Sequence, residues 1–166
     1  THCISSAASD VYKRQLFIGL VGFFICSYLA LFVLPADATQ QEIYRILFVH
    51  VPAAIFSELI YIFMACCGFI YLVWKTKISA IMLRSAISLG LVFTLIVLIS
   101  GAIWGKPTWG TYWVWDARIT STFILLIQYI GLLALRTSFN TMQTTDQILS
   151  IVAIAVSYTH LRAHET

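Results

Sequence analysis

The sequence predicts an all-α protein, a polytopic transmembrane helix bundle. Of its 166 residues, 60% are hydrophobic and only 10% are charged, and the mean hydropathy is +0.90. So few charges cannot cover the surface of a soluble domain of this size, which favours the bilayer as the environment. Several apolar runs also approach the ~20 residues that a helix needs to cross the hydrocarbon core. Because these runs are apolar on all sides, only a helix satisfies their backbone hydrogen bonds in lipid.

Four apolar runs are long enough to cross the membrane, and a fifth begins in the same way. The four complete spans are expected at residues 16–34, 53–74, 85–103 and 119–135. The fifth run, residues 148–156, is too short to cross. The sequence therefore predicts four complete spans and a truncated fifth, joined by short connections.

The basic residues of the connections predict the orientation of the chain, because cytoplasmic loops carry an excess of Lys and Arg. One set of connections holds Lys13, Arg14, Lys75, Lys77, Arg84 and Arg136, and the other holds Arg45, Lys106 and Arg118. The larger set is expected in the cytoplasm, with the N-terminus, which places residues 104–120 at the outer face. A net charge of +3 is too small and too scattered to indicate a nucleic-acid partner.

The two ends of the sequence differ from the apolar region between them. Residues 1–15 have no hydrophobic pattern, and after residue 156 the fifth run changes abruptly to SYTHLRAHET. We expect residues 1–15 and 157–166 to be non-native tails around a membrane domain, residues 16–156, that is incomplete at its C-terminal end; ordinary mobile termini are the alternative. The four cysteines lack metal-ligand spacing and are interpreted as structural or incidental: Cys3, Cys26, Cys66 and Cys67.

The connection DATQQEIYRILFVHVP, residues 37–52, predicts a short amphipathic helix in the outer interface. Thr39 and Glu42 have the spacing of a capping box, and His50 continues an apolar stripe of helical period that begins at Ile43. Pro52 is expected to end this helix just after His50. His50 then has two interpretations: an interfacial side chain bonded to a carbonyl, or an axial iron ligand or proton-linked switch.

The connection WGKPTWGTYWVWDARIT, residues 104–120, concentrates aromatic side chains: Trp104, Trp109, Tyr112, Trp113 and Trp115. The simplest explanation of Trp and Tyr near a span end is an interfacial aromatic belt, and the isolated Trp74 fits it. Five aromatic residues in one connection are more than such a belt needs. Trp109, Tyr112 and Trp113 are expected to share a helical face. The residues Gly105, Pro107 and Gly110 are expected to break regular structure. The connection therefore predicts a flat aromatic shelf at the membrane surface.

Charged residues flank this shelf. Lys106 and Arg118 supply cations at its edges, and Asp116 is placed to orient one of them. Such a surface suits a large planar ligand with acidic groups at its rim. Haem is one such ligand, because aromatic rings would cover the macrocycle, cations would bind the propionates, and a histidine would bind the iron.

These two connections carry a resemblance to a known family. The stretch WGKPTWGTYWVWDARIT resembles the tryptophan-rich WWD motif of membrane proteins that handle haem in cytochrome c biogenesis. Together with YRILFVHVPAA it resembles the haem exporter protein C family of the cytochrome c maturation pathway, over residues 16–156. The related haem lyases continue after WD with proline, lysine and glutamate, whereas this chain continues with ARIT, which favours protein C.

The resemblance implies a multi-pass protein of the bacterial inner membrane, or of mitochondria in some lineages. It implies that the tryptophan loop and two outer histidines hold haem b non-covalently and present it to a periplasmic haem chaperone. It also implies other membrane subunits of the maturation complex, including an ABC-type transporter. The first family histidine matches His50, and the motif matches residues 104–120. The second belongs in the connection after the fifth span, and His160 does not match it.

Haem binding and delivery without chemical turnover is therefore the function that the sequence favours. The alternatives are a haem lyase of the same superfamily and a polytopic small-molecule transporter. A transporter needs polar groups along a pathway through its spans, and the predicted spans have few beyond Glu58 and Gln128. Glu58 is expected to lie outside the site, near enough to the span end to reach interfacial water or Arg45.

Overall fold

The computed structural model describes residues 2–136, 138 and 141–165, with side chains described for residues 10–136, 138 and 141–158. All regular elements in these residues are helices, which confirms the all-α prediction. They are α1 (His2–Tyr28), the π-helix η1 (Leu29–Val33), the 3-10 helix η2 (Glu42–Ile46), α2 (Leu47–Trp74), α3 (Lys77–Trp109), α4 (Ala117–Leu135) and α5 (Met142–Glu165).

Four stretches of the described chain are long and apolar enough to cross a membrane, as predicted. They are Asp10–Val33, Glu42–Trp74, Lys77–Trp109 and Ala117–Leu135. Helix α5 begins before the predicted fifth run and continues past it to Glu165. The assignment of residues 1–15 and 157–166 as tails stays a prediction, and the side chains of Cys3 and His160 lie outside the described ones.

The chain forms two compact units, Thr1–Phe48 and Val49–Thr166. In the first unit, a turn after η1 is ordered around Asp37. The Oδ1 atom of Asp37 accepts hydrogen bonds from the Thr39 amide, the Thr39 hydroxyl and the Gln40 amide, each at 2.9 Å. Hydrogen bonds from the two backbone amides and the hydroxyl lower the pKa of Asp37 below its usual range.

The predicted capping box is wrong. The Thr39 hydroxyl bonds Asp37, Glu42 pairs with Arg45, and no side chain caps η2. The physical reason is local competition, because the Asp37 carboxylate accepts hydrogen bonds from the Thr39 hydroxyl and amide, which turns this side chain toward Asp37 and away from the free amides at the start of η2. Arg45 also donates to the carbonyls of Ala30 and Leu34, at 2.9 Å each, which ties η2 to the end of the first span.

The predicted break after His50 is also wrong. Instead of a separate amphipathic helix, η2 passes directly into α2, which begins at Leu47 and runs through Pro52. Pro52, the sixth residue of α2, lacks an N–H and so removes one backbone hydrogen bond, and the helix continues through it. His50 consequently lies in the first turn of the long helix α2.

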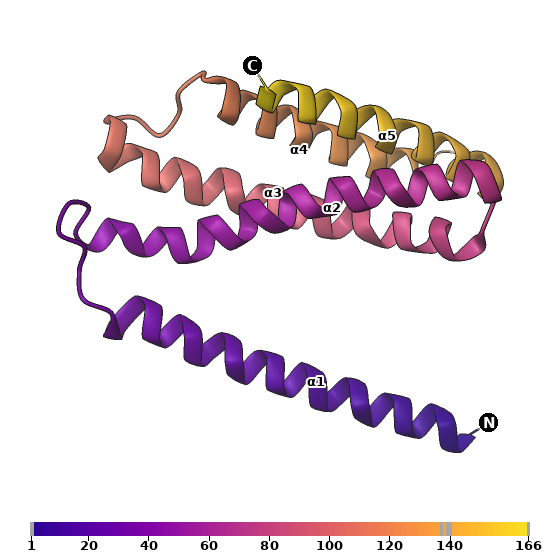
Figure 1. Cartoon of the computed structure of the whole chain (residues 1–166), viewed down its shortest axis with the longest axis horizontal. Helices are drawn as coiled ribbons and strands as arrows, with labels where there is room; N and C mark the ends of the chain where they lie inside the picture. The colour runs from indigo at the N-terminus through magenta and orange to yellow at the C-terminus, as the bar shows by residue number, and fades with distance from the viewer. Residues whose placement is uncertain (1, 137, 139–140, 166) are drawn as a thin grey trace. The chain divides into compact units, whose positions relative to one another are not determined.

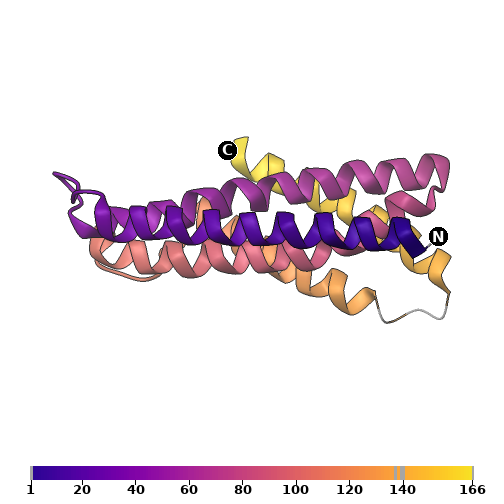
Figure 2. The ribbon, with the colours of Figure 1, turned by 90° about the horizontal axis from the view of Figure 1, so that it is seen from below.

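The second unit is an antiparallel bundle of the four helices α2 to α5, in which α5 crosses α2 obliquely (Figures 1 and 2). Its core contains Tyr61, Met64, Cys67, Leu83, Ala86, Ile87, Leu125, Tyr129, Leu132, Leu149, Ala153 and Val156. Close approach depends on glycine at two places. A Cβ at Gly90 would lie 2.2 Å from the Tyr129 ring, and one at Gly68 would lie 2.9 Å from the Ser150 carbonyl oxygen.

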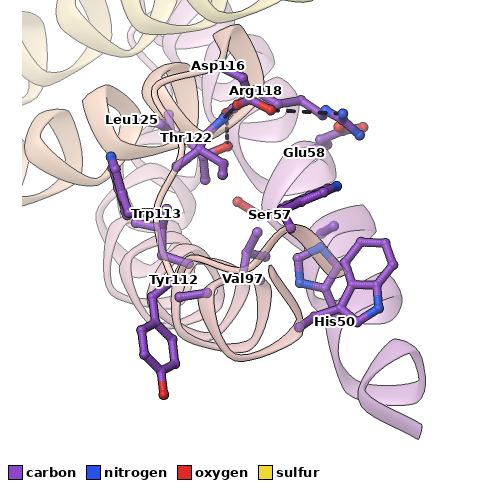
Figure 3. A pocket seen from close by; sticks show the side chains of 17 residues that line it. His50, Ser57, Glu58, Val97, Tyr112, Trp113, Asp116, Arg118, Thr122 and Leu125 are labelled. Carbon is purple, nitrogen blue, oxygen red and sulfur yellow. Dashed lines mark hydrogen bonds and ion pairs between the residues drawn. The ribbon is translucent and has the colours of Figure 1, made fainter. Parts of the chain in front are cut away.

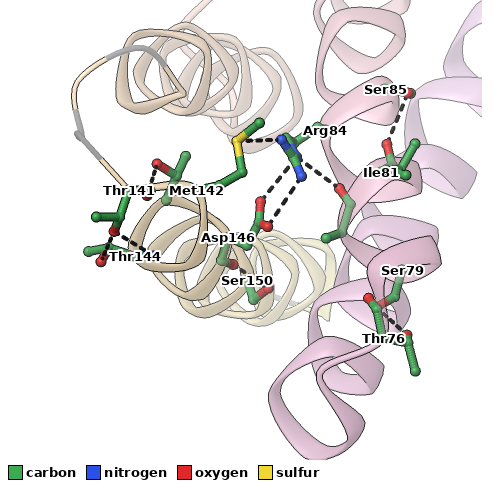
Figure 4. Close-up of polar contacts among 12 residues, drawn as sticks. Thr76, Ser79, Ile81, Arg84, Ser85, Thr141, Met142, Thr144, Asp146 and Ser150 are labelled. Carbon is green, nitrogen blue, oxygen red and sulfur yellow. Dashed lines mark hydrogen bonds and ion pairs between the residues drawn. The ribbon is translucent and has the colours of Figure 1, made fainter.

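Helix direction sorts the connections of this bundle into two ends. The α2–α3 and α4–α5 connections lie at one end, and the α3–α4 connection lies at the other with the start of α2 (Figure 1). At the first end, here called the Arg84 end, Arg84 of α3 pairs with Asp146 of α5 (Figure 4). The opposite end contains both segments that the sequence singles out, His50 and residues 104–118.

Candidate functional site

A pocket opens at the end of the bundle opposite Arg84 (Figure 3). Its space is about 870 Å³, counting the part open to solvent. Seven predicted site residues line it: His50, Trp104, Trp109, Tyr112, Trp113, Asp116 and Arg118. Trp115 does not line it, and its side chain is 74% exposed. Three helices and the α3–α4 connection thus bring most of the predicted set together.

His50 enters this pocket from α2 and rests against α3. Its Nδ1 atom lies 2.9 Å from the Ser100 hydroxyl, and its ring centroid is 6.2 Å from that of Trp104. Gly101 makes room for the imidazole, because a Cβ there would lie only 3.2 Å from the Cε1 atom of His50. The imidazole is therefore held by α3 at the wall of the pocket.

Helix α3 carries Trp104 and Trp109 further than predicted. Neither Gly105 nor Pro107 breaks it; it ends at Gly110, which adopts the left-handed φ of 78°. The Gly110 amide donates to the Lys106 carbonyl at 3.0 Å, closing the helix end. Since Trp109 is the last helical residue, Tyr112 and Trp113 cannot share its helical face, and that prediction is wrong.

The aromatic side chains form edge-to-face pairs rather than a flat shelf. Trp104 and Trp109 meet at 60° with ring centroids 5.8 Å apart, and Trp113 and Trp115 meet at 73° and 5.5 Å. Trp113 also packs at 85° on Phe123 of α4. This geometry follows the ring quadrupole, which favours edge-to-face contact over coplanar stacking. The pocket wall is thus aromatic but folded.

The charged residues have unequal positions. Asp116 caps α4, its Oδ1 atom accepting from the Ile119 amide at 2.7 Å, and its Oδ2 atom lies 4.0 Å from Arg118. Lys106 instead donates to the Gly110 carbonyl at 3.0 Å and lies over the Tyr112 ring. Arg118 is therefore the predicted cation that lines the pocket, whereas Lys106 lies in the last turn of α3 and does not line it.

Glu58 lines the pocket, so the prediction that it lies outside the site is wrong (Figure 3). Eight residues after His50, it follows on the same face of α2 at about two helical turns. This spacing is the feature of the sequence from which the place of Glu58 beside His50 could have been predicted. Arg45, its predicted neighbour, instead bonds within the first unit.

Ser100 and Gly101 had no role in the sequence-based site. Their contacts with His50 depend on how α2 and α3 align, and no local pattern encodes that alignment. The Ser57 and Thr94 hydroxyls, 3.0 Å apart and buried, form a second polar contact between the same helices. The site therefore includes a polar seam that the sequence did not indicate.

The site suits a planar ligand bound through one imidazole better than a bare metal ion. Among the described residues, no three His, Cys, Asp or Glu side chains are grouped as ligands of an ion. His50 supplies a single ring nitrogen, the tryptophans supply apolar wall, and Arg118 supplies a cation at its edge. The buried Nε1–H of Trp113 also has no acceptor among the described groups. The pocket residues therefore fit an aromatic macrocycle with acidic substituents.

Comparisons of the sequence with known proteins identify the family of this chain. The family model of Heme exporter protein C matches residues 2–159. Heme exporter protein C of Escherichia coli K12 is 45% identical over 120 residues, which cover 72% of this chain and 49% of that protein. A cytochrome c biosynthesis ccmC-like mitochondrial protein of Marchantia polymorpha is 46% identical over 121 residues, covering 72% of this chain and 53% of that protein.

Heme exporter protein C of Paracoccus denitrificans is 44% identical over 104 residues, which cover 63% of this chain and 43% of that protein. The chain spans about half the length of the curated relatives it matches. The family match covers nearly the whole chain, including both segments that form the pocket. The chain belongs to the Heme exporter protein C family.

Proposed function

We propose that this protein binds haem at the pocket end of its bundle and passes it on for cytochrome c maturation, without chemical turnover of its own. The observation that carries the proposal is the convergence of His50, four aromatic residues and Arg118 on one pocket. The names of the relatives, which refer to heme export and cytochrome c biosynthesis, point to the same process.

Each part of the pocket has a role in this proposal. His50 binds the iron of non-covalent haem b through one imidazole nitrogen. Trp104, Trp109 and Trp113 cover the macrocycle, since a large aromatic side chain can bury about 150–250 Å². Arg118 pairs with a propionate, and Asp116 orients Arg118. Haem is cargo here, so the site must hold it and also release it.

The outer face of a bacterial inner membrane is the proposed location of the pocket. Lys75, Lys77, Arg84 and Arg136 lie at the opposite end of the bundle, which the excess of basic residues assigns to the cytoplasm. A reporter that is active only in the periplasm should work when fused after Lys106 and fail when fused after Lys77. The reverse result would invert the topology.

A periplasmic haem chaperone is the proposed acceptor, with other membrane subunits, including an ABC-type transporter, as neighbours. The exposed Trp115 and Tyr112 lie on the same connection as the pocket wall, so a protein that docks there reaches the haem directly. If the chain transfers haem to a chaperone and transports no other small molecule, its function is haem delivery and not small-molecule transport. Formation of a covalent haem–cytochrome product by the chain alone would instead indicate a haem lyase.

The test is haem binding by the purified chain in detergent. The wild-type chain should retain haem with an absorption spectrum typical of histidine ligation. His50→Ala should abolish that spectrum, and added imidazole should partly restore it. His160→Ala, outside the described side chains, serves as the control and should leave the spectrum unchanged. An unchanged spectrum in His50→Ala together with a lost one in His160→Ala would overturn the ligand assignment.

A further inference from the structure

We infer that Ser100 is the positioning residue of His50: its hydroxyl accepts the Nδ1–H of the imidazole and so reserves Nε2 for the ligand. The inference rests on the proposed function for the identity of that ligand. Its geometric basis is the 2.9 Å distance between His50 Nδ1 and Ser100 Oγ, which joins α2 to α3 at the pocket wall.

The single hydroxyl hydrogen of Ser100 is used within α3. Ser100 Oγ lies 2.5 Å from the Ile96 carbonyl oxygen and 3.3 Å from that of Val97. A carbonyl oxygen can only accept, so the hydroxyl donates its hydrogen there. Toward His50, Ser100 is left with lone pairs alone. We therefore assign the hydrogen in the contact to Nδ1 of His50, whose ring also has a hydrogen bond with the Val97 backbone.

This hydrogen bond determines the tautomer of the neutral imidazole. A neutral ring carries one N–H, so a hydrogen on Nδ1 leaves Nε2 with a free lone pair. A metal-binding histidine typically donates its other N–H to an acceptor, which fixes the orientation of the ring and raises its basicity. Ser100 meets this requirement before any ligand arrives.

The neighbours of Ser100 restrict the ring further. Gly101 leaves only the space that the imidazole occupies, since a Cβ would lie 3.2 Å from Cε1. Trp104, one turn further along α3, lies against the ring with centroids 6.2 Å apart. Ser100, Gly101 and Trp104 thus lie on one side of α3, where hydrogen bonding, close packing and aromatic contact act on the same side chain.

Removal of the Ser100 hydroxyl should leave the helices packed. The Ser57–Thr94 hydrogen bond at 3.0 Å and the Phe56–Phe93 ring stack at 5.2 Å also join α2 to α3. Ser100→Ala therefore tests orientation of the imidazole, with little effect on the fold. Ser100→Thr keeps a hydroxyl at the same place and should restore the wild-type behaviour.

Two measurements on the purified chain test the inference. Nitrogen-15 NMR of histidine-labelled chain without haem should show the Nδ1–H tautomer for His50, assigned by comparison with His50→Ala. Haem titration should show Ser100→Ala binding roughly 10–100-fold more weakly than wild type, with Ser100→Thr close to wild type. The matched control is Ser85→Ala, because the Ser85 hydroxyl also bonds a carbonyl four residues earlier on α3, but at the Arg84 end (Figure 4).

The outcomes separate this inference from the proposed function. If the wild-type chain binds haem but His50 has the Nε2–H tautomer, or Ser100→Ala binds as tightly as wild type, the positioning role is wrong and haem binding stands. If Ser100→Thr is as weak as Ser100→Ala, the hydroxyl is not the cause and the inference is also wrong. If the wild-type chain binds no haem, the proposed function fails and the inference fails with it.

Discussion

The two ends of the bundle each contain an arginine–aspartate pair, and the two pairs differ in the distance between the charged groups and in how far they are buried. At the Arg84 end, Arg84 and Asp146 lie 3.0 Å apart with side chains only 17% and 8% exposed. At the pocket end, Arg118 and Asp116 lie 4.0 Å apart with side chains 75% and 34% exposed. The Arg84–Asp146 pair is buried and in direct contact, whereas Arg118 is exposed beside the pocket and can pair with a ligand.

The difference shows how scarce charges are divided in a membrane protein. Arg84 has a further contact with the Met142 sulfur at 2.9 Å and a second bond to Asp146 at 3.2 Å (Figure 4), so its contacts join α3 to α5. In the described part of the chain, Arg118 forms no ion pair with another helix, while Asp116 caps α4 by accepting a hydrogen bond from the Ile119 amide. Charge at the Arg84 end supports the fold, and charge at the pocket end supports binding.

The largest expected effect is on stability, at the Arg84–Asp146 pair. Asp146→Leu leaves Arg84 buried without its carboxylate and should lower the free energy of unfolding by about 3–5 kcal/mol. Unfolding in mixed detergent micelles measures this change. Asp116→Asn is the matched control at the other end, because it keeps the capping oxygen and should change stability by less than about 0.5 kcal/mol. Equal losses would show that the two pairs have the same role.

The next effect is on binding, through the aromatic wall. Trp113→Ala should weaken haem binding by about 30-fold, or about 2 kcal/mol, because the ring lines the pocket and packs on Phe123. Trp115→Ala should weaken it by about threefold or less, since Trp115 is 74% exposed and does not line the pocket. Trp74→Ala, at the far end of α2, should have no effect. Haem titration of the three variants measures these changes, and equal losses would mean that the aromatics are only an interfacial belt.

The smallest effect concerns the exposed Arg118. Arg118→Met should weaken haem binding about threefold, in line with ~0.5–1 kcal/mol for an exposed ion pair, and leave stability nearly unchanged. The loss should shrink in 1 M salt, where the screening length is about 3 Å. Lys77→Met, an exposed cation at the Arg84 end, provides the control. A loss of stability comparable to that of Asp146→Leu would remove the distinction between the two ends.

Local features of the sequence predicted the helices and most of the pocket residues. Long apolar runs determine helices because the backbone has no other partner in lipid, and the aromatic connection identified Trp104, Trp109 and Trp113. Two finer predictions were wrong. The capping box does not form because Asp37 accepts the hydrogen bond of the Thr39 hydroxyl, and the helix break does not form because α2 continues through Pro52. Glu58 and Ser100 were missed because their place in the site depends on the alignment of two helices, which no single segment encodes.

The buried Ser57–Thr94 hydrogen bond has a consequence for assembly in the bilayer. A pair of apolar helices can slide past each other at little cost, because lipid tails replace the lost contacts equally well. A hydroxyl pair resists this motion, since sliding one helix by one residue moves the two groups apart by about 1.5 Å along the axis and loses a hydrogen bond of about 0.6–2 kcal/mol. Two turns along α2, His50 meets Ser100 only when α2 and α3 are correctly aligned. The Ser57–Thr94 bond thus discriminates against misaligned hairpins of α2 and α3 before any ligand is present.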